Sequence, residues 1–322
     1  MTHAGQTAMM VWRGRERPAA APPSLPRLSR KALTPCWNNL NQLRWVDGFA
    51  FASHGVRLGV RVSDPALLPM LRERLPRTAT PSAARGVDRY FSIILGGPRQ
   101  GSRVRRYHLL YVDHALYTRS LNLDDVIAGF ESAVRLSVAE LAPRHVFIHA
   151  GVVGWKGHAI LVPGKTFSGK TSLVVELVKA GATYYSDEFA VIDARGRVHA
   201  FLQPLGIREN GSDRQRNVPV EEIGGRAGSK PLPVGLVVFS EYQPGARWRP
   251  RTMSDGLGTL ALLSNSVGAR RRPGPTLATL ERVVANASVV KTKRGEAVAV
   301  TPHVLNALEA FRDSRRGEGS RP

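Results

Sequence analysis

The sequence predicts an α/β protein with a larger core domain and a smaller α/β unit before it. Three observations lead to this fold class. A strand-like run at 158–162 is followed by a glycine-rich loop and then by helical spacing over 170–180. Strand-like and helix-like segments also alternate along the rest of the chain. Finally, 322 residues, 43% of them hydrophobic, suffice for one to three domains with buried cores.

Composition divides the chain into four parts. Residues 1–44 are rich in Pro, Ala and Arg and lack periodicity, so we expect a disordered basic leader. Residues 45–141 are expected to form the small α/β unit, and residues 142–311 the phosphate-binding domain. Residues 312–322 are expected to be a polar tail.

In the small unit, strands are predicted where apolar and β-branched residues run between Gly, Pro and Asp turn signals. Asp64 is expected to cap a short helix whose first turn contains Pro65. Apolar residues at helical spacing predict a further helix over 124–141. The predicted strand regions are 49–62, 89–95, 107–112 and 115–119.

In the larger domain, the apolar runs 146–153 and 158–162 are joined by a glycine-containing tetrapeptide, which predicts a hairpin. The helix over 170–180 is expected to stop at Gly181. Thr301–Pro302 is predicted to be the N-cap and first turn of a final helix. The remaining predicted strands are 184–185, 189–192, 198–202 and 236–239, and the helices are 255–264, 276–286 and 303–311.

The pattern G-x-x-x-x-G-K-[ST] of phosphate-binding loops is matched in full by Gly164, Lys165, Thr166, Phe167, Ser168, Gly169, Lys170 and Thr171. Backbone N–H groups of such a loop surround a phosphate, and the following helix adds its positive end. Lys170 is then expected to reach the β- and γ-phosphates, and Thr171 to bind Mg²⁺. Lys165 either contacts a phosphate or is solvated. A chance match occurs in roughly one in a hundred chains of this length, and the strand and helix on either side favour a nucleotide site.

An acidic pair, Asp187 and Glu188, follows Thr171 after one predicted helix and one short strand. This closeness is typical of a compact kinase-like site, where one carboxylate holds Mg²⁺ and the other accepts the proton of the substrate hydroxyl. A solvated acidic turn is the alternative interpretation. His149 lies in the apolar strand before the loop; from the sequence alone, such a histidine is more often a core residue than a catalytic one.

These features lie together within about residues 145–200, in the run IHAGVVGWKGHAILVPGKTFSGKTSLVVELVKAGATYYSDEFAVID. This run resembles the C-terminal kinase domain of the HPr serine kinase/phosphorylase family. That family also has a strand histidine, a hairpin, a P-loop, a helix and an acidic pair in this order. The resemblance implies a fold related to phosphoenolpyruvate carboxykinases. It also implies phosphorylation of a serine or other hydroxyl of a protein or peptide, with ATP and Mg²⁺.

By this resemblance, Lys170, Asp187 and His149 are the expected catalytic residues, and Thr171 and Glu188 the expected Mg²⁺ ligands. The family's usual Asp-Asp pair is Asp-Glu in this chain, and its Glu-x-Arg-Gly motif has no clear match. Residues 45–141 do not match the family's regulatory domain. The chain therefore resembles a divergent HPr-kinase-like protein, of the kind found beside peptide-modification genes. Family members form hexamers, so a homo-oligomer stays open.

The formal net charge of +21 comes from 38 Arg and eight Lys against 25 Asp and Glu. Residues 151–200, which carry the motifs, have six cations and four anions, or a net charge of +2. Because the excess is spread over the rest of the chain, we expect a basic surface and no specific nucleic-acid binding. Cys36 is the single cysteine, which excludes an intrachain disulfide and cysteine-rich zinc sites.

Neither a membrane-spanning apolar run nor the apolar core of a secretory signal is present, so a cytoplasmic location is expected. Three other functions stay open beside the kinase. They are an ATP-binding or ATP-hydrolysing module without transfer to a partner, a small-molecule phosphotransferase, and a nucleic-acid binder that only the charge favours.

Overall fold

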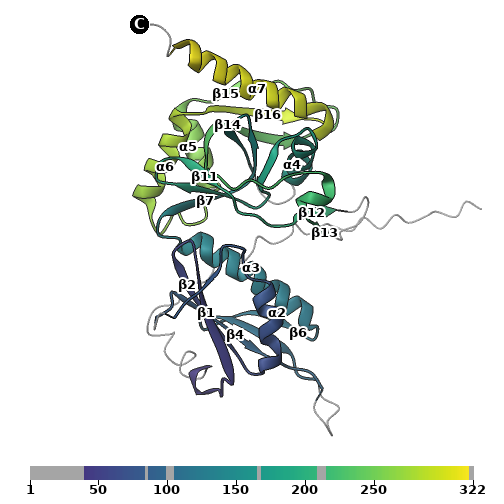
Figure 1. The fold of residues 1–322 in the computed structure, drawn as a ribbon, viewed down its shortest axis with the longest axis vertical. Coiled ribbons are helices and arrows are strands. Elements are labelled where there is room, and N and C mark those ends of the chain that lie inside the picture. The colour runs from purple at the N-terminus through teal and green to yellow at the C-terminus, as the bar shows by residue number, and fades with distance from the viewer. Residues whose placement is uncertain (1–39, 84–85, 99–104, 165–167, 209–214, 319–322) are drawn as a thin grey trace, which may run out of the picture. The chain divides into compact units, whose positions relative to one another are not determined.

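The computed structural model describes residues 40–83, 86–98, 105–164, 168–208 and 215–318. Residues 44–322 belong to one compact unit, and the elements below lie within it (Figure 1). The fold is mixed α/β, with two large β-sheets and helices packed on them. The predicted α/β class is confirmed. The predicted leader, residues 1–44, falls almost entirely outside the described residues.

The first sheet is built from the N-terminal part of this unit. Its strands, in order across the sheet, are β3 (Thr80–Pro81), β1 (Asp47–Ser53), β2 (Val56–Val62), β4 (Arg89–Ile94), β5 (His108–Val112) and β6 (Ala115–Ser120). Strands β2 and β4 are parallel, and the chain between them includes η1 (Pro65–Leu67) and α2 (Leu68–Glu73). Asp64 caps η1 as predicted, because its Oδ1 accepts a hydrogen bond of 2.9 Å from the N–H of Ala66.

Helix α3 (Leu123–Leu141) packs on β5 and β6 and matches the helix predicted over 124–141. The Asn122 side chain caps it by accepting a hydrogen bond from the N–H of Asp124. On its apolar face, Phe130 is fully buried and meets Phe91 of the sheet edge to face, with ring centroids 5.5 Å apart. Burying such an aromatic side chain stabilises the fold by about 1.5–3 kcal/mol.

The second sheet contains eight strands among the described residues. They are β7 (His145–Trp155), β8 (His158–Pro163), β9 (Thr183–Ser186), β10 (Phe189–Asp193), β11 (Arg197–His199), β14 (Leu232–Tyr242), β15 (Arg251–Thr252) and β16 (Ser288–Arg294). Strand β14 is parallel to β8 and to β16. Because β11 pairs with both β10 and β14, the strands β11, β10, β7, β8 and β14 form a closed ring of hydrogen-bonded neighbours.

Two pairs of helices flank this sheet. Helices α4 (Lys170–Lys179) and α7 (Ala297–Glu318) share one buried cluster, and α5 (Asp255–Ser264) and α6 (Pro273–Ala285) share another. Successive residues of β8 alternate between them, with Ile160 in the first cluster and Leu161 in the second. A small hairpin of β12 (Leu205–Arg208) and β13 (Gln215–Val218), then η2 (Val220–Ile223), precedes β14.

The final helix begins earlier than predicted. Thr301–Pro302 was expected to start it, but α7 begins at Ala297 and Pro302 lies inside it. Proline has no N–H, so the carbonyl of Val298 loses its helical partner. Val298 is 68% exposed, so this break in the hydrogen-bond pattern lies on the surface of the fold. Helix α7 also continues to Glu318, so residues 312–318 of the predicted tail extend the helix.

Several other elements agree closely with the sequence-based predictions, and some strands were missed. The predicted hairpin is formed by β7 and β8, and α5 has the predicted bounds. Helix α4 ends at Lys179, and Gly181 just beyond it has a φ of 99°. Strands β3, β12, β13, β15 and β16 were not predicted. No described helix is long and apolar enough to cross a membrane.

Candidate functional site

The glycine-rich loop connects β8 to α4, as the motif requires. Of its eight residues, Gly164 and Ser168–Thr171 are described, whereas Lys165, Thr166 and Phe167 lie outside the described residues. The N–H of Gly164 donates a hydrogen bond of 3.2 Å to the carbonyl of His149 on the neighbouring strand. A Cβ on Gly164 would lie 2.6 Å from the hydroxyl of Ser168, so a larger residue at position 164 would require that side chain to move.

Gly169 is the N-cap of α4 and has a φ of 78°, a left-handed conformation that glycine adopts without strain. Its carbonyl accepts a hydrogen bond of 2.7 Å from Nη2 of Arg294, at the end of β16. Arg294 is only 2% exposed, and its guanidinium lies 5.6 Å from the ring centroid of Tyr242. Burial lowers the pKa of Arg294. Arg294 therefore fixes the position of the Gly169 carbonyl at the end of the loop. No sequence motif predicted this contact.

The acidic pair follows β9 directly. The hydroxyl of Ser186 accepts hydrogen bonds from the N–H of Glu188 (3.2 Å) and of Phe189 (3.0 Å), which fixes the turn that presents both carboxylates. Oγ1 of Thr171 donates a hydrogen bond of 2.9 Å to Oδ2 of Asp187. The structure therefore brings together the last residue of the glycine-rich loop and the first acid of the pair.

Asp187 has an unusual protonation equilibrium. Burial raises its pKa to about 6, although the hydrogen bond from Thr171 and the charge of Lys170 work in the opposite direction. Its Oδ1 is buried and has no hydrogen-bond partner of normal geometry among the described residues, although the N–H of Gly206 also acts to lower the pKa of this carboxyl group. Burial also lowers the pKa of Lys170, against the attraction of Asp187 and Glu188. A carboxyl group with a pKa close to neutrality can exchange protons readily at physiological pH.

Glu188 has a different partner. Its Oε2 lies 2.8 Å from Nε of Arg135 on α3, and Nη1 of Arg135 lies 2.7 Å from Glu131. Burial raises the pKa of Glu188, and the charge of Arg135 opposes this shift. The Glu188 side chain keeps 35% of its surface exposed. The first sheet's helix thus supplies a cation to the acidic pair, a contact that sequence spacing does not reveal.

His149 is not the core residue that an apolar strand favoured, because its side chain is exposed. Its ring lies 4.8 Å from the ring of Phe189, which is its partner in the register of β7 and β10. Desolvation by the surrounding protein lowers the pKa of His149, and the positive charge of Lys170 lowers it further. This shift favours the neutral form of the imidazole, which has a free ring nitrogen to accept a proton.

The described residues hold no group of three or more His, Cys, Asp or Glu side chains placed to bind a metal. Mg²⁺ beside a nucleotide needs fewer protein ligands, because phosphate oxygens and water complete its octahedral shell. The Thr171 hydroxyl and the unpartnered Oδ1 of Asp187 are oxygens of the type that this ion prefers. The residues present therefore fit a nucleotide-bound Mg²⁺.

The chain was also compared with known proteins. It matches no protein-family model, and no curated protein matches it.

Proposed function

We propose that the protein is an ATP- and Mg²⁺-dependent kinase of the HPr-kinase-like type, acting on a serine or other hydroxyl of a protein or peptide. The hydrogen bond between Thr171 and Asp187 carries the proposal. It joins a glycine-rich loop, with Lys170 at its end, to a carboxyl group whose pKa is about 6. Phosphoryl transfer needs positioned cations, a metal-binding hydroxyl and a proton acceptor.

The N-terminus of α4 and Lys170 are assigned to binding the β- and γ-phosphates of ATP. Thr171 and Glu188 would hold Mg²⁺, which when bound would neutralise charge on the phosphates. Asp187 is assigned to accepting the proton of the attacking hydroxyl, since a base with a pKa near the working pH is most effective. The exposed, neutral His149 is assigned to orienting that hydroxyl or relaying its proton.

The second candidate is an ATP-binding or ATP-hydrolysing module without a phosphorylated partner. The ion pair of Glu188 with Arg135 favours it, because a carboxylate held at 2.8 Å by a cation is a poorer metal ligand. Both candidates require nucleotide binding by the same loop, and they differ in where the γ-phosphate goes.

The decisive experiment gives the purified full chain Mg²⁺, ATP labelled on the γ-phosphate and an array of serine-, threonine- and tyrosine-containing peptides. The kinase predicts label on a subset of peptides, lost in Lys170→Ala and reduced about a hundredfold or more in Asp187→Asn. Lys179→Ala, on the exposed end of α4, is the matched control and should keep activity. ATP binding with release of labelled phosphate, and with no labelled peptide or protein, would instead establish the module.

A further inference from the structure

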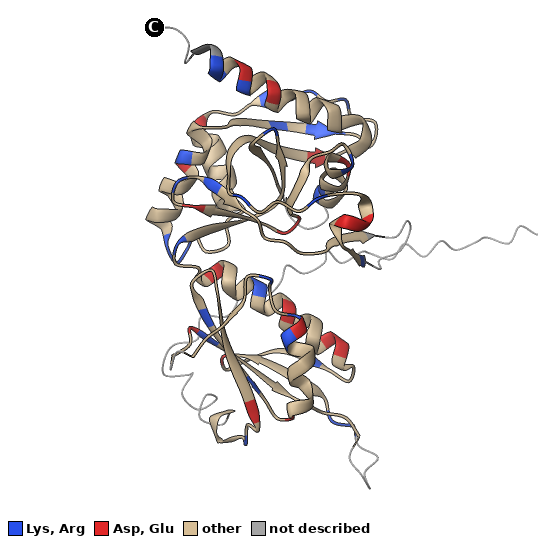
Figure 2. Ribbon diagram, viewed as in Figure 1, with Lys and Arg blue, Asp and Glu red and all other residues tan. Residues whose placement is uncertain are grey.

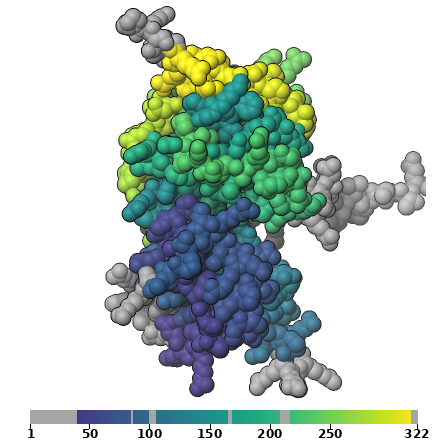
Figure 3. Space-filling view, in the orientation of Figure 1, coloured from purple at the N-terminus to yellow at the C-terminus, as the bar shows by residue number. Residues whose placement is uncertain are grey.

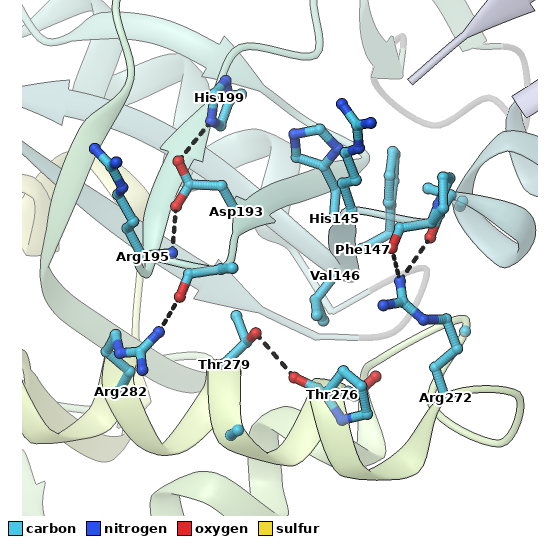
Figure 4. Close-up of a pocket in the computed structure, with 18 of the residues that line it drawn as sticks. His145, Val146, Phe147, Asp193, Arg195, His199, Arg272, Thr276, Thr279 and Arg282 are labelled. Atoms are coloured by element: carbon cyan, nitrogen blue, oxygen red, sulfur yellow. Dashed lines mark hydrogen bonds and ion pairs between the residues drawn. The ribbon is translucent and has the colours of Figure 1, made fainter. Parts of the chain in front are cut away.

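Two cavities lie away from the glycine-rich loop and share part of their walls. The first, of about 620 Å³, is lined by the end of α3, the ends of β7 and β10, and α6 (Figure 4). The second, of about 500 Å³, is lined by α6, the start of β14 and the C-terminal part of α7. Arg195 and Arg282 line both cavities. We call the two cavities together the arginine groove.

Arginines dominate the charge of this groove. Arg144 and Arg272 also line the first cavity, and the second adds Arg312, Arg315 and Arg316. The acids among the lining residues are Glu140 and Asp193. Each is already engaged. Glu140 pairs with Arg89 at 2.9 Å and with Arg271 at 3.2 Å, and Asp193 lies 2.9 Å from Nε2 of His199.

Several of the guanidinium groups are held in place without being neutralised. Arg272 donates to the carbonyls of Ala142 and Pro143, and Arg282 to that of Ala194, as Figure 4 shows. Arg315 donates to the carbonyl of Ala285 at 2.7 Å. A carbonyl orients an arginine but leaves its charge and most of its five N–H donors available. The groove therefore presents cations that are oriented before any ligand arrives.

Charged residues occur throughout the fold. Lys and Arg are spread along many elements, and Asp and Glu lie among them (Figure 2). The helix that contributes Arg312, Arg315 and Arg316 lies on the surface, in yellow in Figure 3. Seven arginines line two adjoining cavities, and both lining acids are already engaged, so the groove is strongly basic.

We propose that the arginine groove is a docking site for an acidic peptide segment. Guanidinium groups bind carboxylates in a two-pronged geometry, and apolar wall residues such as Val146 and Pro275 suit the side chains between the acids. Single-stranded nucleic acid fits less well, because it needs exposed aromatic rings for its bases. Phe147 is buried, and the ring of Phe311 already has the guanidinium of Arg315 at 5.6 Å.

The groove is also close to the acidic pair along one strand. β10 begins at Phe189, next to Glu188, and ends at Asp193 in the first cavity. These four residue steps span about 13 Å. A substrate anchored in the groove needs only a few extended residues to cover such a length. The groove's role in choosing substrates rests on the proposed kinase activity; peptide binding itself does not.

The test uses the full chain without ATP and a fluorescein-labelled octaglutamate peptide, with binding followed by anisotropy. Arg195→Ala/Arg282→Ala should weaken binding about tenfold, because both side chains line both cavities. Arg249→Ala/Arg251→Ala removes the same charge from exposed positions and should change binding less than about twofold. Arg312→Ala, at the far end of the groove, tests the proposal independently if the first variant loses its fold by circular dichroism.

Equal losses in the two double variants would show diffuse charge attraction and overturn the proposal. Tighter binding of labelled octathymidylate, lost in the same groove variant, would identify a nucleic-acid site and overturn it too. Lys170→Ala should leave peptide binding unchanged, since the glycine-rich loop is not involved. If the protein binds ATP but the groove variants bind octaglutamate like the wild type, the docking site is wrong and the kinase proposal stands. If the groove variants lose octaglutamate binding but the protein does not bind ATP, the kinase proposal is wrong and the docking site stands.

Discussion

The hydroxyl of Thr171 donates a hydrogen bond of 2.9 Å to Asp187, across 16 residues of chain. Thr171 lies in the first turn of α4, and Asp187 follows β9. The bond therefore joins the end of the glycine-rich loop to the acidic pair before any nucleotide is bound. Four predictions follow from this site and from the residues that support it.

The first concerns nucleotide affinity. Lys170→Ala removes the cation assigned to the phosphates, and hydrogen bonds to charged groups contribute about 1.5–3 kcal/mol. ATP binding in the presence of Mg²⁺ should therefore weaken by roughly ten- to a hundredfold, as measured by isothermal titration calorimetry. Lys179→Ala breaks only an exposed pair with Glu176 and should bind ATP like the wild type. Unchanged affinity in Lys170→Ala would remove the loop from the proposed site.

The second concerns the dependence of stability on pH. Burial raises the pKa of Asp187 from its usual 3.8 to about 6 in the folded protein. The folded state therefore holds this proton more tightly than the unfolded chain, and stability falls as pH rises from about 4 to about 6. Asp187→Asn removes that loss and should raise the free energy of unfolding by about 1–3 kcal/mol at pH 7, with little change at pH 4. Thermal denaturation of the ligand-free wild type and variant at pH 7 and at pH 4 measures these two differences in stability.

Asp193→Asn is the control, and it should change stability at pH 7 in the opposite direction. Burial alone acts to raise the pKa of Asp193, but hydrogen bonds from His199 and from the N–H groups of Arg197 and Arg195 lower it overall. Its ionised form therefore stabilises the fold above the unfolded pKa, and that contribution is lost as pH falls through the folded pKa. The substitution should lower the melting temperature at pH 7. Shifts of the same sign in both variants would contradict the assignment of Asp187.

The third concerns the ion pair between Arg135 and Glu188. Their side chains are 18% and 35% exposed, so solvent weakens the pair and its coupling energy should be about 1 kcal/mol or less. In a double-mutant cycle of Arg135→Met and Glu188→Gln, the double variant should lose less stability than the two single variants together. Urea denaturation gives the three values. Strict additivity would mean that the two side chains do not interact in solution.

The fourth concerns the backbone of the loop. A Cβ on Gly169 would lie 2.4 Å from Nη2 of Arg294, in a left-handed conformation. Gly169→Ala should therefore lower the melting temperature and weaken ATP binding, because the loop must shift away from Arg294. Gly157→Ala places the same methyl group at a φ of 84° in open space. It should cost only about 1 kcal/mol and leave ATP affinity unchanged. Equal effects on ATP affinity would contradict a role of Arg294 in holding the loop.

Local patterns made much of this architecture predictable. Helical spacing predicted α3 and α4, and the glycine motif predicted where strand, loop and helix meet. Arg294 and Arg135 escaped prediction because their contacts depend on tertiary structure. Arg294 reaches Gly169 across 125 residues from an unpredicted strand, and Arg135 was expected only as part of a helix. Pro302 misled the prediction since an exposed backbone turn tolerates a proline that usually marks a helix start.

The backbone hydrogen bond from Gly164 to His149 has a practical consequence. It ties the entrance of the loop to a strand residue whose exposed imidazole lies beside the ring of Phe189. If nucleotide binding moves the loop, that hydrogen bond would pass the movement to the backbone of His149 and shift its imidazole in the ring current of Phe189. The ring protons of His149 therefore offer a built-in nuclear magnetic resonance signal for occupancy of the loop, without any attached label.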